Sequence, residues 1–375
     1  MIDRKKIKKV LILRYRFVGD TVLSIPFIRN VREQFPDAQI DVLVSPNSGE
    51  LIENNPDVNK VIYFDNTTFH KYEGDSVNCG RDAPWGVSTI DKQTYFSFID
   101  CANALRKENY DLIFVLKRSF SSALLAFLSG AKYRIGFGTE FRSFLLTQVV
   151  KYDKNIHELD NFLNCLRPLG VEPKKYTPEI FPSEQEVRKA QGFLIRLDRF
   201  KPKVLIHATS AHPYKMWPKR YFAKLMDYLF DEFEAQFVFT GTKLDKPVYE
   251  GIIDWCQNKS KFKILDLCGL TTLQECYAVY KGVDLAICVD SGNAHLASAA
   301  GILTYVLYGP TRPEQWLPIG KDGKNVFPVR LNQLLPCQPC DVKVVCDHVS
   351  CMKLLTPEFL FSKLSVLGSH NKVSV

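Results

Sequence analysis

Short apolar runs recur along the chain, several of them followed by glycine, aspartate or serine, and helical apolar patterns separate them. In the first half these runs span residues 10–14, 40–44, 61–64, 112–116 and 133–136. Continuously apolar strands of this length are typical of a parallel sheet that is covered on both faces. The pattern therefore predicts an α/β fold with parallel sheets.

The second half repeats the same alternation. Its predicted strands span residues 203–207, 236–240, 263–267, 285–289 and 304–308. A chain of 375 residues is too long for one ordinary core, and residues 171–183 carry three prolines, as a linker does. We therefore expect one domain over 1–175, a second over 183–355, and a helical tail over 356–375 that packs back on the first domain. Ligands of such sheets bind at the carboxyl ends of the strands, so the cleft between two facing domains is the expected site.

Residues 66–96 interrupt the first domain with a polar stretch that has no clear period. A loop of this length inside a compact domain is a lid, a binding loop or a disordered insert. Two interpretations remain open, a mobile insert near a site and a plain surface excursion.

The charge balance favours an anionic partner. Lys and Arg total 49 against 41 Asp and Glu, a net charge of +8, which suits nucleic acid, a membrane surface or a phosphorylated small molecule. We expect no nucleic-acid partner, because no RNA-binding signature and no basic stripe interleaved with aromatics is present. No apolar run reaches the ~18 residues of a membrane span, and the apolar stretch behind the basic N-terminus is too short for a signal peptide. We expect a cytoplasmic protein whose membrane association, if any, is peripheral.

The segment around Asp290, Ser291 and Gly292 joins the end of a predicted strand to the start of a predicted helix. The first N–H groups of a helix have no internal partner and its dipole is positive there, which favours phosphate. Gly292 allows close approach of a ligand, Asp290 can accept hydrogen bonds from ligand hydroxyls, and His295 can donate to a phosphate oxygen. The alternative is that Asp290 is a helix N-cap and His295 a core residue.

Two further strand ends of the second domain carry groups that suit phosphate. Thr209 and Ser210 follow one strand and Lys215 lies shortly after them, while Gly309 and Thr311 follow another. The chain has no GxGxxG or Walker A pattern, which disfavours an ordinary dinucleotide or P-loop site.

In the first domain the candidate is Asp20, which follows the first predicted strand with Arg14 and Arg16 just before it. A carboxylate beside a cationic rim can act as general base on a hydroxyl of an anionic acceptor. The alternative is again a helix N-cap.

These segments together resemble the family 9 glycosyltransferases, the lipopolysaccharide heptosyltransferases. The similarity lies in GDTVLSIP around Asp20, in HATS followed by KMWP, and in DSGNAHLASAAG followed by YGPTRPEQW, and it extends from Val10 to about Pro357. The resemblance implies a GT-B fold with two facing Rossmann-like domains. It also implies an inverting, metal-independent transfer of heptose from ADP-heptose to the lipid A–Kdo inner core of lipopolysaccharide, an anionic glycolipid, at the inner face of the cytoplasmic membrane. No cofactor is then required, and we expect a monomer.

The resemblance also implies roles for the candidate residues. Asp20 would be the catalytic base, and Lys215 would offset the charge on departing ADP in place of a metal. Arg14 and Arg16 would bind acceptor anions. The donor-binding residues would be Thr209, Ser210, Gly241, Asp290, Ser291, Gly292, His295, Gly309 and Thr311.

Two alternatives to this function stay open at the level of sequence. One is a related glycosyltransferase that uses another nucleotide sugar for a surface glycan, and the other is a nucleotide-binding protein without transferase activity. The motifs concern the diphosphate, whereas contacts to the donor hydroxyls decide which sugar is bound.

Four of the 11 cysteines cluster near the C-terminus, at Cys337, Cys340, Cys346 and Cys351. Four thiols in 15 residues could hold a structural zinc ion or form a disulfide, but the spacing matches no common zinc finger. Free thiols in a packed loop are the alternative. The other seven cysteines are scattered along the chain, and those in apolar segments suit core packing.

Overall fold

The computed structural model describes residues 2–65, 94–342 and 346–364 and divides into two compact units. Unit 1 comprises Met1–Ser183 and Pro318–Asp322, and unit 2 comprises Glu184–Leu317 and Gly323–Val375. The predicted linker, 171–183, contains no helix or strand. The segment Pro318–Asp322, where the chain returns to unit 1, was predicted to belong to the second domain.

The sheet of unit 1 is parallel at every strand pair, in the order β4-β3-β2-β1-β5-β6-β7. Its strands are β1 (Lys9–Leu13), β2 (Gln39–Val44), β3 (Lys60–Phe64), β4 (Thr94–Tyr95), β5 (Leu112–Val115), β6 (Tyr133–Phe137) and β7 (Gln148–Val150). The strand order reverses between β1 and β5, which makes their carboxyl ends the switch point where ligands of open α/β sheets bind.

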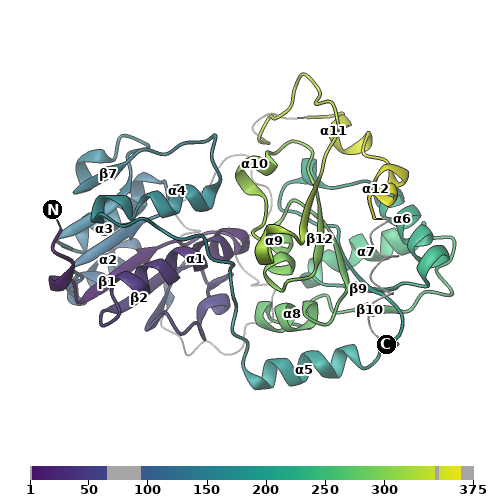
Figure 1. Ribbon diagram of the computed structural model, residues 1–375, viewed down its shortest axis with the longest axis horizontal. Helices are drawn as coiled ribbons and strands as arrows, with labels where there is room; N and C mark the ends of the chain where they lie inside the picture. Colours follow the sequence, from purple (N-terminus) through teal and green to yellow (C-terminus); the bar gives the residue numbers. More distant parts are fainter. Residues whose placement is uncertain (1, 66–93, 343–345, 365–375) are drawn as a thin grey trace. The chain divides into compact units, whose positions relative to one another are not determined.

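Helices cover both faces of this sheet (Figure 1). They are α1 (Val18–Gln34), α2 (Phe98–Lys107), α3 (Phe120–Leu128) and α4 (Glu158–Asn164). Successive strand residues point to opposite faces, so Leu11 and Leu13 pack in one core cluster with α2 and α3. The opposite face packs against α1, where the rings of Phe27 and Phe114 meet edge to face at 5.1 Å. Burial on both faces explains why the strands are continuously apolar.

The sheet of unit 2 is also parallel, in the order β10-β9-β8-β11-β12-β13. Its strands are β8 (Lys203–His207), β9 (Gln236–Phe239), β10 (Ile264–Asp266), β11 (Leu285–Val289), β12 (Leu303–Leu307) and β13 (Val326–Val329). The reversal of strand order lies between β8 and β11. The predicted parallel sheets are therefore confirmed in both units.

The helices of unit 2 again form two layers. They are α5 (Glu184–Leu194), α6 (Lys219–Phe233), α7 (Lys246–Ile253), α8 (Leu273–Tyr280), α9 (Gly292–Ala299), α10 (Pro313–Trp316), α11 (Ser350–Lys353) and α12 (Pro357–Lys363). One core cluster joins the sheet to α6, α7, α11 and α12. Helix α5 packs on α8, and α8 on α9, whose residues also contact β11 and β12.

The predicted return of the tail to the first domain is wrong for α12. This helix packs on α6 of its own unit, because Leu360 and Leu364 enter the core of unit 2. Tyr228 on α6 also donates a hydrogen bond to Glu358 Oε1 at 2.9 Å. Residues 365–375 of the predicted tail lie outside the described residues.

Other elements differ from the sequence-based expectation. The predicted helix over 157–169 ends at Asn164 and continues as a 3-10 turn, Arg167–Leu169, whose Pro168 has no N–H to extend an α-helix. Within the predicted insert Thr94 and Tyr95 form β4, while residues 66–93 lie outside the described residues. Across the described ranges, the helices are all too short or too polar to cross a bilayer.

Candidate active site

The switch point of unit 2 brings together three of the predicted side chains. Lys215 Nζ lies 2.8 Å from Asp290 Oδ2, and the Thr311 hydroxyl donates to the same oxygen at 2.6 Å. These residues come from the loops after β8, β11 and β12. The side chains of Lys215 and Asp290 are 16% and 8% exposed, so the ion pair is shielded from water on most sides. The cluster offers a cation, a carboxylate and a hydroxyl group at the place where a parallel sheet binds its ligand.

A buried tryptophan fixes the loop that carries Lys215. Pro213–Lys215 is a single 3-10 turn, and Trp217 follows it with 2% of its surface exposed. The Trp217 indole donates to the Leu355 carbonyl at 2.7 Å, and its ring packs edge to face on Phe222. The loop is therefore anchored by Trp217 in the core and by α6, which begins two residues later at Lys219.

Helix α9 begins directly after Asp290. Its N-cap residue is Ser291, and no side chain caps the helix, so the N-cap alternative for Asp290 is wrong. The Ser291 hydroxyl is buried and has no hydrogen-bond partner among the described residues. His295 is buried on the same helix. The helix therefore presents N–H groups and a hydroxyl that suit an anion beside the Lys215–Asp290 pair.

The remaining residues predicted to bind the donor are two hydroxyl residues and two glycines. Thr209 is buried and Ser210 half-buried in the loop after β8. At Gly241 and Gly309 the side chain of any other residue would clash with a neighbouring side chain. A Cβ on Gly241 would lie 2.7 Å from Asp245 Oδ2, and one on Gly309 would lie 2.4 Å from Met352 Sδ. Both glycines follow strand ends, so they shape the edge of the site whether or not they contact a ligand.

His207, the last residue of β8, lies in a buried polar network beneath this cluster. Its Nδ1 is 3.3 Å from the Thr240 carbonyl, and its Nε2 is 3.2 Å from Asn293 Nδ2. Tyr280 donates to the side-chain oxygen of Asn293 at 2.9 Å. One ring nitrogen thus donates and the other accepts, which fits a neutral imidazole. Burial lowers the pKa of His207, and the charge of Asp245 acts in the opposite direction.

This network predicts a loss of stability in mild acid. The unfolded chain binds a proton at His207 near pH 6.5, whereas the folded chain does so only at lower pH. The free energy of unfolding should therefore fall as the pH drops below about 6.5, by at most about 1.4 kcal/mol per pH unit from this residue. Urea unfolding of wild type and His207→Gln at pH 7.5, 6.5 and 5.5 (about one pK unit either side of the midpoint) measures the contribution. Equal slopes in the two proteins would exclude it.

The switch point of unit 1 holds Asp20 and Arg14. Asp20 lies in the first turn of α1, whose N-cap is Phe17, so the N-cap alternative is wrong here as well. Arg14 Nη2 contacts Asp20 Oδ1 at 2.6 Å, and both side chains are less than 10% exposed. The guanidinium also lies over the Phe162 ring, and its Nε has no hydrogen-bond partner within the described ranges. Arg16 is exposed and lies over the ring of Phe17.

Two buried charged residues near this pair escaped the sequence-based prediction. Lys117 follows β5, and its ammonium lies 3.9 Å from the centre of the Tyr15 ring. Burial, followed by the charges of Arg16 and Arg14, lowers the pKa of Lys117 to about 7. Glu158 begins α4 and accepts a hydrogen bond from Tyr152 at 2.7 Å, and burial raises its pKa. A lysine directly after the predicted strand 112–116 was a usable signal for Lys117.

The cysteine cluster is not arranged as a metal centre in the described residues. Nowhere within 2–65, 94–342 and 346–364 do three or more His, Cys, Asp or Glu side chains form a group that could hold a metal ion. The four thiols are free, and Cys351 is the most buried of them. Burial and the nearby thiol of Cys340 raise the pKa of Cys351 to about 11. The Cys351 side chain packs beside Gly309.

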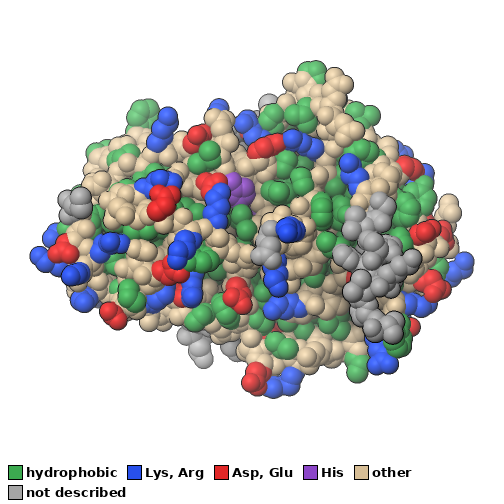
Figure 2. All heavy atoms as spheres, in the orientation of Figure 1, with side chains coloured by type: hydrophobic (Ala, Val, Ile, Leu, Met, Phe, Trp, Pro, Cys, Tyr) green, Lys and Arg blue, Asp and Glu red, His purple; other side chains and the backbone are tan. Residues whose placement is uncertain are grey.

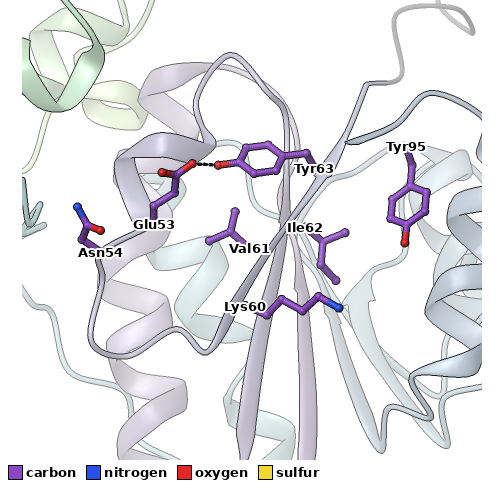
Figure 3. A pocket seen from close by; sticks show the side chains of 7 residues that line it. All are labelled: Glu53, Asn54, Lys60, Val61, Ile62, Tyr63 and Tyr95. Carbon is purple, nitrogen blue, oxygen red and sulfur yellow. Dashed lines mark hydrogen bonds between the residues drawn. The ribbon is translucent and has the colours of Figure 1, made fainter. Parts of the chain in front are cut away.

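A separate pocket of about 430 Å³ lies beside β3 and β4 (Figure 3). The Tyr63 hydroxyl on its wall is hydrogen-bonded to Glu53. Its lining residues are Glu53, Asn54, Lys60, Val61, Ile62, Tyr63 and Tyr95. None of the residues predicted for donor or acceptor binding belongs to this pocket.

Comparison with known proteins gives consistent results. The family model described as glycosyltransferase family 9 (heptosyltransferase) matches residues 99–344. The lipooligosaccharide heptosyltransferase 2 of Haemophilus influenzae is 25% identical over 380 residues, which cover 96% of this chain and 99% of that protein.

Several solved structures cover almost the whole chain, and two of them are heptosyltransferases of Escherichia coli. The Escherichia coli ADP-heptose LPS heptosyltransferase II has a TM-score of 0.74 and 22% identity, over 97% of this chain and 100% of that one. The E. coli heptosyltransferase WaaC with ADP has a TM-score of 0.68 and 17% identity, over 95% and 99%. This likeness and the two parallel sheets confirm the predicted α/β fold of the GT-B type.

Proposed function

Because the chain belongs to glycosyltransferase family 9, we propose that it transfers a heptose from ADP-heptose to the inner core of lipopolysaccharide, with lipid A–Kdo as the acceptor. The observation that carries the proposal is the Lys215–Asp290–Thr311 cluster at the switch point of unit 2, in a chain aligned over 96% of its length with a heptosyltransferase. The complex of WaaC with ADP, a protein of similar fold, supports ADP as the nucleotide of the donor.

On the acceptor side, Asp20 is the proposed base. One carboxylate oxygen is held by Arg14, which fixes the orientation of the group, and the second oxygen takes the proton of the acceptor hydroxyl. That hydroxyl then attacks the anomeric carbon from the face opposite ADP, which inverts the configuration. Arg14 and Arg16 supply the positive charge for acceptor anions, and the Arg14 Nε described above is one available donor.

On the donor side, Lys215 is the proposed counter-charge for ADP. Its ammonium lies close to the start of α9, so that the diphosphate would meet Lys215, the Ser291 hydroxyl and the first N–H groups of the helix together. Fixed positive charge of this kind stabilises the leaving group as the glycosidic bond breaks, and the transfer then needs no metal ion. Asp290 and Thr311 are the proposed partners for hydroxyls of the donor sugar.

The first test is calorimetric binding of ADP, UDP, GDP and CMP to the purified protein in the presence of EDTA. We expect selective binding of ADP, followed by EDTA-resistant transfer from ADP-heptose to lipid A–Kdo. The anomeric configuration of the product, measured by NMR, tests inversion. Preference for UDP or GDP would move the function to another nucleotide sugar, and ADP binding without any transfer would favour a nucleotide-binding protein.

The proposal also covers where the enzyme acts. A glycolipid acceptor places a monomeric enzyme at the inner face of the cytoplasmic membrane, where its net charge of +8 suits anionic lipid. Sedimentation velocity of the purified protein measures the oligomeric state.

A further inference from the structure

Unit 1 exposes a group of large apolar side chains on α3 and on the segment between β6 and the end of β7. Phe141 is 97% exposed and Phe144 is 73% exposed. The complete set, called the α3–β7 face below, is Phe120, Phe127, Leu128, Phe141, Phe144 and Val149. Single exposed apolar residues are common on soluble proteins, but a contiguous group of them marks an interaction surface.

Contacts within unit 1 link Phe120, Phe127, Phe144 and Val149 across the α3–β7 face. The rings of Phe120 and Phe144 lie 6.3 Å apart, and the guanidinium of Arg134 lies over the Phe127 ring. Arg134 Nε also donates to the Leu145 carbonyl at 2.8 Å, which links α3 to the Phe144 segment. Val149 lies beside Gly138 and Ser143, since a Cβ on Gly138 would touch both side chains.

The loop that carries Phe141 is held in place from below. Arg142 is fully buried, and its guanidinium donates to the carbonyls of Phe137, Lys117 and Ser119 at 2.6–2.7 Å. Glu140 and Phe141 adopt φ values of 53° and 55°, a conformation that non-glycine residues rarely take. The backbone is thus fixed in a form that turns a phenylalanine outward, although a polar residue would be the usual choice for such a position.

Within residues 117–151, the stretch of chain that includes the α3–β7 face, the charged residues are almost all positive. Accessible or half-buried basic residues on this part of the chain are Arg118, Lys132, Arg134 and Lys151, and the sole acidic residue between 117 and 151 is Glu140. One oxygen of Glu140 accepts a hydrogen bond from the Phe120 backbone N–H at 2.7 Å. Figure 2 shows hydrophobic and basic side chains side by side along the edge of unit 1 near β7.

From this combination we propose that the α3–β7 face docks the protein onto the surface of a bilayer that contains anionic lipids. Aromatic rings enter the interfacial layer, while the surrounding arginine and lysine side chains contact the headgroups. A second copy of this chain is a poorer occupant, because a symmetric dimer through this face would bring the same positive charges together. The inference deepens the proposed function, since it rests on an acceptor that is itself a membrane lipid.

Flotation of the full-length protein with vesicles tests the proposal. The vesicles are phosphatidylcholine with about 30% phosphatidylglycerol. On these vesicles Phe141→Ser/Phe144→Ser should lower the ratio of vesicle-bound to free protein about tenfold or more. Lys132→Gln should lower it about fivefold, as expected for one basic side chain near an anionic surface. The matched control is Phe200→Ser/Trp255→Ser, which removes aromatics that are 80% and 65% exposed on unit 2 and should bind as wild type does.

The outcomes separate this proposal from the proposed function. The Phe141/Phe144 variant should transfer heptose at the wild-type rate to a water-soluble acceptor without acyl chains, and should lose rate on vesicle-bound acceptor. Wild-type vesicle binding by that variant would overturn the docking proposal and leave the transferase proposal intact. A change in sedimentation velocity without a change in vesicle binding would assign the face to self-association instead. Failure of all proteins to transfer, with the vesicle results as expected, would overturn the function alone.

Discussion

Replacing Asp20 by Asn is expected to lower the turnover number of heptose transfer by about two to four orders of magnitude, the usual contribution of a general base. The affinity for ADP should stay within about twofold, because Asp20 belongs to unit 1 and the proposed ADP ligands belong to unit 2. The measurement combines steady-state transfer rates with calorimetric titration of ADP. A variant that kept more than about a tenth of the wild-type turnover would remove Asp20 from the role of base.

The ion pair with Arg14 calls for a control, since the substitution leaves a buried guanidinium without its carboxylate. Breaking a buried pair in this way costs about 3 kcal/mol of stability and could lower activity indirectly. Asp57→Asn controls for the loss of a buried, paired carboxylate in the same unit, because Asp57 is buried and pairs at 2.9 Å with Arg29, whose side chain is 51% exposed. We expect both variants to lose thermal stability and only Asp20→Asn to lose turnover.

The fold was largely predictable because strands that are buried on both faces consist almost entirely of apolar residues. All five residues of β11 are buried, and the sequence there is Leu-Ala-Ile-Cys-Val. The order of the strands could not be predicted, since β1 pairs with β5 across about 100 residues of chain and no local pattern encodes that choice. Helix α2 was missed although Ser97 caps it and its apolar residues follow a helical period, a signal that was available.

The site was predictable where a polar residue follows an apolar strand, and less so elsewhere. Asp290 was predicted from such a position and Lys215 from the loop that follows another strand, and their side chains lie 2.8 Å apart. Glu158 lies on a helix with polar neighbours and reads as solvent-facing, yet tertiary packing leaves it 1% exposed. Gly309 was predicted to bind the donor, and the structure shows that it also leaves room for the Met352 side chain. The sequence alone cannot distinguish a glycine that makes room for a ligand from one that makes room for a neighbouring side chain.

Replacing Lys215 by Ala is expected to weaken ADP and ADP-sugar binding about tenfold or more and to lower turnover by about two orders of magnitude. Both effects have the same physical origin, since the ammonium stabilises the diphosphate when bound and stabilises it further as the leaving group. The measurement is again calorimetry together with transfer rates. Lys189→Ala is the matched control, because Lys189 also pairs with a buried carboxylate of unit 2, Glu275, at 2.8 Å, and has no proposed contact with the donor.

A double variant decides how Lys215 acts. The single substitution leaves the Asp290 carboxylate with the Thr311 hydroxyl but without its cation, so repulsion between Asp290 and the diphosphate adds to the loss of the ammonium. If Lys215 only neutralised Asp290, Lys215→Ala/Asp290→Asn would recover wild-type affinity for ADP. We expect partial recovery of affinity and no recovery of turnover, because the charge that develops on the leaving ADP would still lack its cation. Unchanged affinity and rate in the single variant would remove Lys215 from the active site altogether.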